Sequence, residues 1–196
     1  MAKPRAIAAT STALLGLMQD KYPRGEFGPA LDFKLFQGKD FDTGMAEGFT
    51  LFLYRVSVSG STRNLPYRRD ADGRRYRPSM PVDLHYLLTP WATDGEKQQR
   101  MLGWAMRFLE DLGMLGAGQL NHYVAETDTF GKEEGIEVIC DPLPLADYLN
   151  VWDKLKTKMP PSITYLVRMV TLDSDVLIDD RRLVQTRQFD VGAVGS

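Results

Sequence analysis

Phe49-Thr-Leu-Phe-Leu-Tyr-Arg-Val-Ser-Val58 is the stretch that decides the fold class of this chain. Most of its residues are aromatic, aliphatic or β-branched, and apolar residues occupy both odd and even positions. Because successive side chains of a strand point to opposite faces, such a run is typical of a central strand that is covered on both faces. We therefore predict a sheet with this strand near its centre.

The segments around this stretch predict four further strands, at residues 31–37, 82–89, 135–141 and 163–170. In the second of these, every other side chain is apolar. The alternation places Val82, Leu84, Tyr86 and Leu88 on one face of the strand. We expect that face to pack on the main core.

The N-terminal segment predicts an amphipathic helix. One helical face carries Ile7, Ser11, Leu14, Leu15 and Met18, and Tyr22-Pro23 should end the helix, because a residue before proline avoids helical geometry. The segment also loosely resembles a secretion signal, but threonine and serine interrupt its apolar run and no cleavage site follows. We favour the packing helix and expect the protein to be cytoplasmic when synthesised.

Two more helices are predicted in the second half of the chain. Thr93-Asp-Gly-Glu96 has the sequence of a capping box, and the helical pattern that follows it ends at Gly113. Residues 145–155 repeat the helical spacing and precede Met159-Pro-Pro161. Helices and strands do not alternate strictly, so the predicted fold class is α+β, loosely α/β. We expect a single domain over residues 1–196, with a mixed β-sheet packed by about three amphipathic helices.

The composition excludes several classes of protein. The 196 residues carry a net charge of −2, whereas a dedicated nucleic-acid-binding protein is normally basic. A single cysteine, Cys140, and two histidines argue against a metal or iron–sulfur centre, and we predict no cofactor. No run approaches the ~18 consecutive apolar residues of a membrane helix, so we predict no membrane insertion.

The motifs of common enzymes are also missing from the sequence. Gly113-Met-Leu-Gly116-Ala-Gly118 looks like a dinucleotide fingerprint, but it follows a predicted helix where the fingerprint requires a strand. His85 lies on the face of its strand opposite Leu84 and Tyr86, and we interpret it as a structural residue. Cys140 sits in an apolar strand, which favours a buried and unreactive thiol. We predict that the protein is not an enzyme.

Residues 59–80 form a basic insertion between two predicted strands. The insertion contains six arginines and two aspartates, a net charge of +4, which leaves −6 on the rest of the chain. Asp72-Gly73 is a strong hairpin-turn dipeptide, so the insertion is either a basic β-hairpin or a long mobile loop. The insertion is then either a solvated charged loop or an arm that docks on an acidic protein surface. Its arginines are Arg63, Arg68, Arg69, Arg74, Arg75 and Arg77.

The C-terminal run 183–191 has good β-propensity and no proline. Neither of its two faces is apolar enough for a core strand. The run therefore predicts an edge strand that either completes its own sheet or pairs with a neighbouring sheet. The residues that we expect at such an interface are Leu183, Val184, Thr186, Arg187 and Phe189.

Four stretches together carry a family resemblance. They are Arg68-Arg-Asp-Ala-Asp-Gly-Arg-Arg75, Pro81-Val-Asp-Leu-His-Tyr-Leu-Leu-Thr-Pro90, Met101-Leu-Gly-Trp-Ala-Met-Arg-Phe-Leu109 and Pro161-Ser-Ile-Thr-Tyr165. With them, nearly the whole chain resembles the N-terminal domain of the cap, or tail-terminator, proteins of extracellular contractile injection systems of the antifeeding-prophage type. Larger caps of this kind carry an additional C-terminal region.

The resemblance implies a structural protein without catalytic residues. Such caps form a ring, six copies by family analogy, on the distal end of the tube and sheath, where they end polymerisation and hold the sheath extended. The partners would be other copies of the chain and the tube and sheath proteins, in a particle that is either released or attached to a membrane. Composition alone leaves a second hypothesis open: a monomeric adaptor whose basic arm grips an acidic protein.

Overall fold

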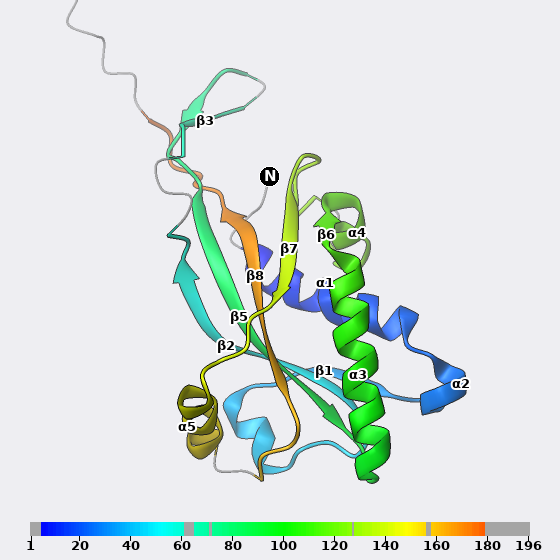
Figure 1. Cartoon of the computed structure of the whole chain (residues 1–196). Helices are drawn as coiled ribbons and strands as arrows, with labels where there is room; N and C mark the ends of the chain where they lie inside the picture. The colour runs from blue at the N-terminus through cyan, green and yellow to red at the C-terminus, as the bar shows by residue number, and fades with distance from the viewer. Residues whose placement is uncertain (1–4, 61–64, 71, 127, 156–157, 179–196) are drawn as a thin grey trace, which may run out of the picture.

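The computed structural model describes residues 5–60, 65–70, 72–126, 128–155 and 158–178. At its centre lies a six-stranded sheet with the strand order β1-β2-β5-β8-β7-β6 (Figure 1). The strands are β1 (Asp32–Leu35), β2 (Gly48–Val58), β5 (Met80–Trp91), β8 (Ile163–Leu172), β7 (Gly135–Cys140) and β6 (Met114–Gly116). Helices pack on both faces of the sheet, which confirms the predicted α+β fold with a mixed sheet.

The pairing of the strands makes β5 the backbone of the sheet. It is antiparallel to β2 on one side, from Gly48 opposite Trp91 to Val58 opposite Val82, and to β8 on the other. β1 is the one parallel strand among the described pairs, and it contacts only residues 48–51 of β2. The two long strands β2 and β5 therefore extend well beyond the short edge strand β1.

The first face of the sheet packs on α1 (Ala6–Lys21) and α3 (Gly95–Leu112), with the short helices α2 (Arg24–Phe27) and α4 (Ala117–His122) beside them (Figure 1). The apolar positions of β5 that alternation placed on one face lie in this main core, and each of them is at most 2% exposed. These residues are Val82, Leu84, Tyr86 and Leu88. The alternation in the sequence therefore identified the core face correctly.

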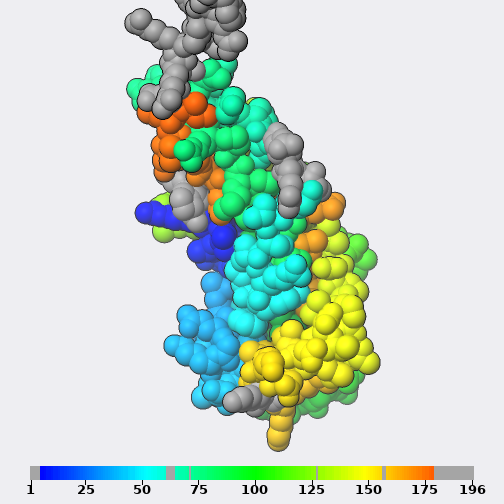
Figure 2. All heavy atoms as spheres, turned by 90° about the vertical axis from the view of Figure 1, so that its left-hand side faces the viewer, coloured from blue at the N-terminus to red at the C-terminus, as the bar shows by residue number. Residues whose placement is uncertain are grey.

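The second face packs on α5 (Leu145–Leu155) and the 3₁₀ helix η1 (Gly38–Asp42) around an aromatic cluster. Phe41 contacts the rings of Phe52 and Trp152 in this cluster. The cover reaches only the half of β2 that begins at Gly48, and Figure 2 shows β2, in cyan, on the surface above α5, in yellow. The prediction that the whole of 49–58 is covered on both faces is therefore wrong for its second half, where Val56 and Val58 are 45% and 53% exposed.

Two local predictions are corrected by the structure. The N-cap of α3 is Asp94, not Thr93: Asp94 is extended and its Oδ2 accepts the N–H of Lys97 at 2.7 Å. The short strand β6 lies between Gly113 and α4, and no strand was predicted there. β6 is antiparallel to β7, so this glycine-rich segment still does not form a parallel βαβ dinucleotide site. Gly113 does end α3, with a φ of 57°.

A buried hydrogen bond between Ser11 of α1 and Tyr86 of β5 ties the first helix to the sheet, at 2.7 Å between Oγ and Oη. Burial raises the pKa of Tyr86, so its phenol stays protonated. Ser11 has a second partner, the Ile7 carbonyl, at 3.2 Å. Removal of the Tyr86 hydroxyl therefore leaves Ser11 with a partner, whereas removal of the Ser11 hydroxyl takes this hydrogen bond from Tyr86.

We predict that Ser11→Ala destabilises the protein more than Tyr86→Phe does. The first change leaves the Tyr86 hydroxyl buried without this partner, at a cost of about 1–3 kcal/mol, whereas the second leaves Ser11 bonded to Ile7, at a cost of about 1 kcal/mol. Urea unfolding measures both free energies, and the double variant should cost less than the two single changes together. A larger loss for Tyr86→Phe would contradict this account.

Candidate assembly interface

The basic insertion folds as a β-hairpin that extends past the end of β5 (Figure 1). Its strands are β3 (Arg68–Arg69) and β4 (Arg75–Tyr76), and Gly73 takes a φ of 79° in the turn. Asp70 closes the turn, because its carboxylate accepts the Arg74 N–H at 2.9 Å and the Tyr76 hydroxyl at 3.1 Å. Desolvation opposes ionisation of Asp70, but these hydrogen bonds lower its pKa overall. Asp72-Gly73 left two forms of the insertion open, a β-hairpin or a long loop, and the structure shows the hairpin.

A segment from far along the chain adds a third strand to this hairpin. After β8, residues 176–178 run antiparallel to β4: Arg77 N–H donates to the Val176 carbonyl at 3.0 Å, and Ile178 N–H donates to the Arg75 carbonyl at 2.8 Å. We call residues 65–70, 72–79 and 176–178 the arm. The arm is therefore held by a backbone ladder as well as by its own turn.

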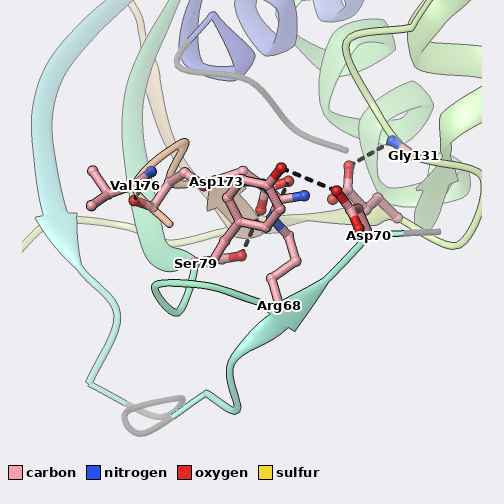
Figure 3. A network of polar contacts seen from close by, with 9 residues as sticks. Arg68, Asp70, Ser79, Gly131, Asp173 and Val176 are labelled. Carbon is pink, nitrogen blue, oxygen red and sulfur yellow. Dashed lines mark hydrogen bonds and ion pairs between the residues drawn. The ribbon is translucent and has the colours of Figure 1, made fainter. Parts of the chain in front are cut away.

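Arg68 fastens the arm to the end of β8 (Figure 3). Its guanidinium lies over the Tyr76 ring at 4.2 Å, donates to the Ser174 carbonyl at 3.0 Å and lies 3.8 Å from Oδ2 of Asp173. The Ser79 hydroxyl donates to the other carboxylate oxygen of Asp173 at 2.5 Å. The side chains of Arg68 and Asp173 are only 15% and 8% exposed, so this ion pair is a structural contact within the chain.

The other arginines of the predicted interface differ in exposure. Arg69, Arg74 and Arg77 are exposed on the arm, whereas Arg75 is half-buried with its guanidinium 5.2 Å from the Tyr67 ring. Arg63 lies outside the described residues. The C-terminal candidates also lie outside the described residues; they are Leu183, Val184, Thr186, Arg187 and Phe189.

The half of β2 nearest the arm has an open backbone edge within the described part of the chain. Ser59 N–H donates to the Pro81 carbonyl of β5 at 3.0 Å. Because N–H groups alternate sides along a strand, those of Val56 and Val58 face away from β5, beyond the residues that pair with β1. Exposed valines on an unpaired edge form a surface that can add another strand.

The sequence analysis missed a cluster of three polar side chains, which come together only in the folded sheet. Ser57 Oγ lies 3.2 Å from Nε2 of His85, and Nδ1 of His85 lies 3.9 Å from Asp141. Burial and the neighbouring Arg55 lower the pKa of His85, so the imidazole is neutral at pH 7. The carboxylate is too far away to orient the imidazole by a hydrogen bond, and the N–H of Ser57 is directed at β5 in the ladder. The group is a partly buried polar network.

The described residues give little support for a metal site, a reactive thiol or a membrane-spanning helix. No group of three or more histidine, cysteine, aspartate or glutamate side chains among them could hold a metal ion. Cys140 is half-buried, where full burial was expected, and desolvation together with nearby Glu110 and Asp141 raises the pKa of its thiol. Among the described helices, none combines the length and the apolar character needed to cross a bilayer.

The described surface thus combines an open strand edge on β2 with a basic arm. The chain belongs to the Pvc16 N-terminal domain family, whose model matches residues 9–186. A search of curated protein sequences found no match to the chain.

Two solved structures share the fold. One is the PVC sheath/tube terminator of an extracellular contractile injection system in its extended state, with a TM-score of 0.63 and 16% identity. The other is the tube-terminating cap of the anti-feeding prophage, with a TM-score of 0.57 and 16% identity. The matches cover 97% of this chain but only 64% and 62% of those proteins. The chain therefore spans less than two thirds of the length of each relative.

We predict that Arg68→Ala loosens the arm without unfolding the domain. Removing the guanidinium takes the ion-pair partner from Asp173, which keeps its hydrogen bond from the Ser79 hydroxyl, and it removes the donor to the Ser174 carbonyl. A loss of about 1.4 kcal/mol in local stability would speed amide exchange at Arg77 and Ile178 about tenfold.

Hydrogen exchange followed by mass spectrometry measures this effect, and Arg69→Ala, at the exposed neighbouring position, is the matched control. Exchange in β2 and β5 should stay unchanged in both variants. Equal exchange of the arm in the two variants would show that the Arg68–Asp173 contact does not hold it.

Proposed function

We propose that the protein is a structural cap that ends the tube and sheath of a phage-tail-like contractile injection particle. Several copies, most simply six, form a closed ring on the distal end and hold the sheath in its extended state. Membership in the Pvc16 N-terminal domain family is the observation that carries this proposal. The shared fold of two terminators, over 97% of the chain, supports it.

The physical task of a terminator suits the surfaces of this chain. The last layer of a helical polymer exposes strand edges and charges that the next layer would have covered. A cap must pair with those groups and offer no equivalent surface for another layer. The open edge of β2, with Val56 and Val58, offers one strand edge of the required kind.

The arm supplies the second contact in this proposal. Its exposed arginines Arg69, Arg74 and Arg77 project beyond the sheet, while the chain outside the insertion carries a net charge of −6. Because every copy in a ring presents both charges, one copy's arm can dock on the acidic body of its neighbour or on the adjacent layer. The ladder with residues 176–178 keeps the arm extended before it binds.

We predict that the purified chain, added to particles that lack a cap, forms a ring at the distal end with the symmetry of the tube. Electron microscopy of particle ends measures this directly. Strictly monomeric binding at the end, or a ring that lacks the symmetry of the tube, would overturn the proposal. Binding to an acidic protein by a chain that stays monomeric at micromolar concentration would favour the adaptor.

We also predict that Arg69→Ser, Arg74→Ser and Arg77→Ser together weaken capping. Each exposed charge pair contributes about 0.5 kcal/mol, so the loss of three weakens the docking of one subunit about tenfold. The melting temperature should stay the same, because all three side chains are exposed. The measurement is the fraction of capped particles against protein concentration.

The matched control removes three exposed arginines elsewhere on the chain, by Arg24→Ser, Arg100→Ser and Arg107→Ser. This variant has the same net charge as the arm variant. If both variants cap equally well, the arm is a solvated loop and does not take part in the interface.

A further inference from the structure

A slot opens beside the outer edge of β1, with a cavity volume of about 800 Å³. Thr12, Leu15 and Gln19 of α1 form one wall, and Asp40 and the residues after η1 form the other. The strand β1 forms the floor. The layers that cover the two faces of the sheet therefore both reach past its last strand, and they leave between them the space that a further strand would occupy.

Within the described part of the chain, the outer edge of β1 presents backbone groups without a strand partner to this slot. Asp32 N–H donates to the Glu47 carbonyl at 3.3 Å, and Phe36 N–H donates to the Leu51 carbonyl at 3.0 Å. Because backbone groups alternate sides along a strand, the N–H and C=O groups of Phe33 and Leu35 face away from β2 and into the slot. These two N–H groups and two carbonyl groups are placed to form hydrogen bonds with an extended polypeptide.

The side chains around the slot favour an occupant with little net charge. Lys34 is paired with Asp32 at 2.7 Å, and the Asp40 carboxylate accepts the N–H of Gln37 at 2.7 Å. Leu35 is 46% exposed and gives the slot an apolar surface. The occupant is therefore an extended segment with apolar side chains and balanced charges.

We propose that the slot receives residues 183–191 of a second copy of this chain, which add a seventh strand to the sheet. The proposal rests on the proposed function, because a ring brings neighbouring copies together in a fixed orientation. The run has good β-propensity, no proline, and one Arg187 against one Asp190, so its net charge is zero. Strand addition uses backbone hydrogen bonds for affinity and apolar side chains for register.

The reach of the chain favours a second copy over the same copy. The described residues end at Ile178, whose N–H bonds to the Arg75 carbonyl on the arm. The arm extends past the end of β5 (Figure 1). From Met80, β5 runs about 26 Å before it reaches Leu88, at the level of the nearest part of β1, at ~3.3 Å per residue. The five residues from Ile178 to Leu183 span at most about 18 Å. Leu183, the first residue of the run, therefore cannot lie on the β1 of its own copy, and only the last residues of the run come within reach of it.

The test uses the full chain assembled on particles, with a photo-crosslinking residue in the slot wall, Gln19→p-benzoylphenylalanine. Half of the chains carry ¹⁵N, so mass spectrometry distinguishes crosslinks between copies from crosslinks within one copy. We expect crosslinks from position 19 to peptides of residues 183–196, with the mixed-isotope pairs that two copies produce. The matched control, Met106→p-benzoylphenylalanine on the exposed face of α3, should give none to that segment.

Other results would overturn the proposal. Crosslinks to the C-terminal segment without mixed-isotope pairs would mean that the tail folds back within one copy. Crosslinks only to tube or sheath proteins would assign the slot to them. A slot that crosslinks to nothing would be an open edge protected by its shortness.

A backbone substitution then tests whether the occupant pairs as a strand. Leu35→Pro removes the N–H that faces the slot and leaves the hydrogen bonds to β2 intact, so the protein should fold with an unchanged melting temperature. In the Gln19 crosslinking background it should reduce the crosslink to the C-terminal segment about tenfold. Leu35→Ala, which keeps the N–H, should retain most of it. Equal reduction in both variants would contradict strand pairing.

The failure of this inference is distinguishable from failure of the proposed function. Particles that are capped normally by Leu35→Pro, without crosslinks to the C-terminal segment, would refute the slot contact and leave the cap intact. Mixed-isotope crosslinks between copies in solution, from a chain that does not bind particles, would refute the cap and leave the slot contact intact.

Discussion

The pairing of β5 with both β2 and β8 is the constraint on which the rest of the structure depends. β5 has twelve residues, and ladders occupy both of its edges. Its half near Trp91 is covered by α1 and α3 on one face and by α5 and η1 on the other, whereas its half near Met80 has no such second layer among the described residues. One end of the sheet therefore extends beyond the part that is covered on both faces, and the arm begins at that end.

This uneven cover explains why the surfaces suited to assembly are backbone edges. Where the second layer ends, the sheet carries polar side chains such as Ser57 and His85, which bond to one another across the strands. Beyond β1, the half of β2 nearest the arm has no further strand beside it in the described part of the chain. Such features suit binding by shape, charge and strand addition, and the exposed side chains of Val56 and Val58 give the open edge an apolar surface.

The sequence predicted the features that depend on local pattern. The alternation in β5, the turn at Asp72-Gly73 and the stop at Gly113 are properties of neighbouring residues, and each was found as expected. The features that were missed need distant partners. Arg68 holds the arm in place because it contacts Asp173, which is more than one hundred residues further along the chain. Nothing near Arg68 in the sequence distinguishes it from Arg69. The slot likewise arises from α1, β1 and η1 together.

The error at the capping box shows that neighbouring residues can compete for one role and that backbone geometry decides between them. Thr93 and Asp94 can both cap a helix, and the extended backbone of Asp94 selects it. In the proposed head-to-tail ring, the slot and the C-terminal run would be the complementary halves of one contact. Such a contact propagates from copy to copy until the ring closes, and closure then uses every slot and every run. The closed ring keeps no free member of that pair, so this contact cannot start another layer.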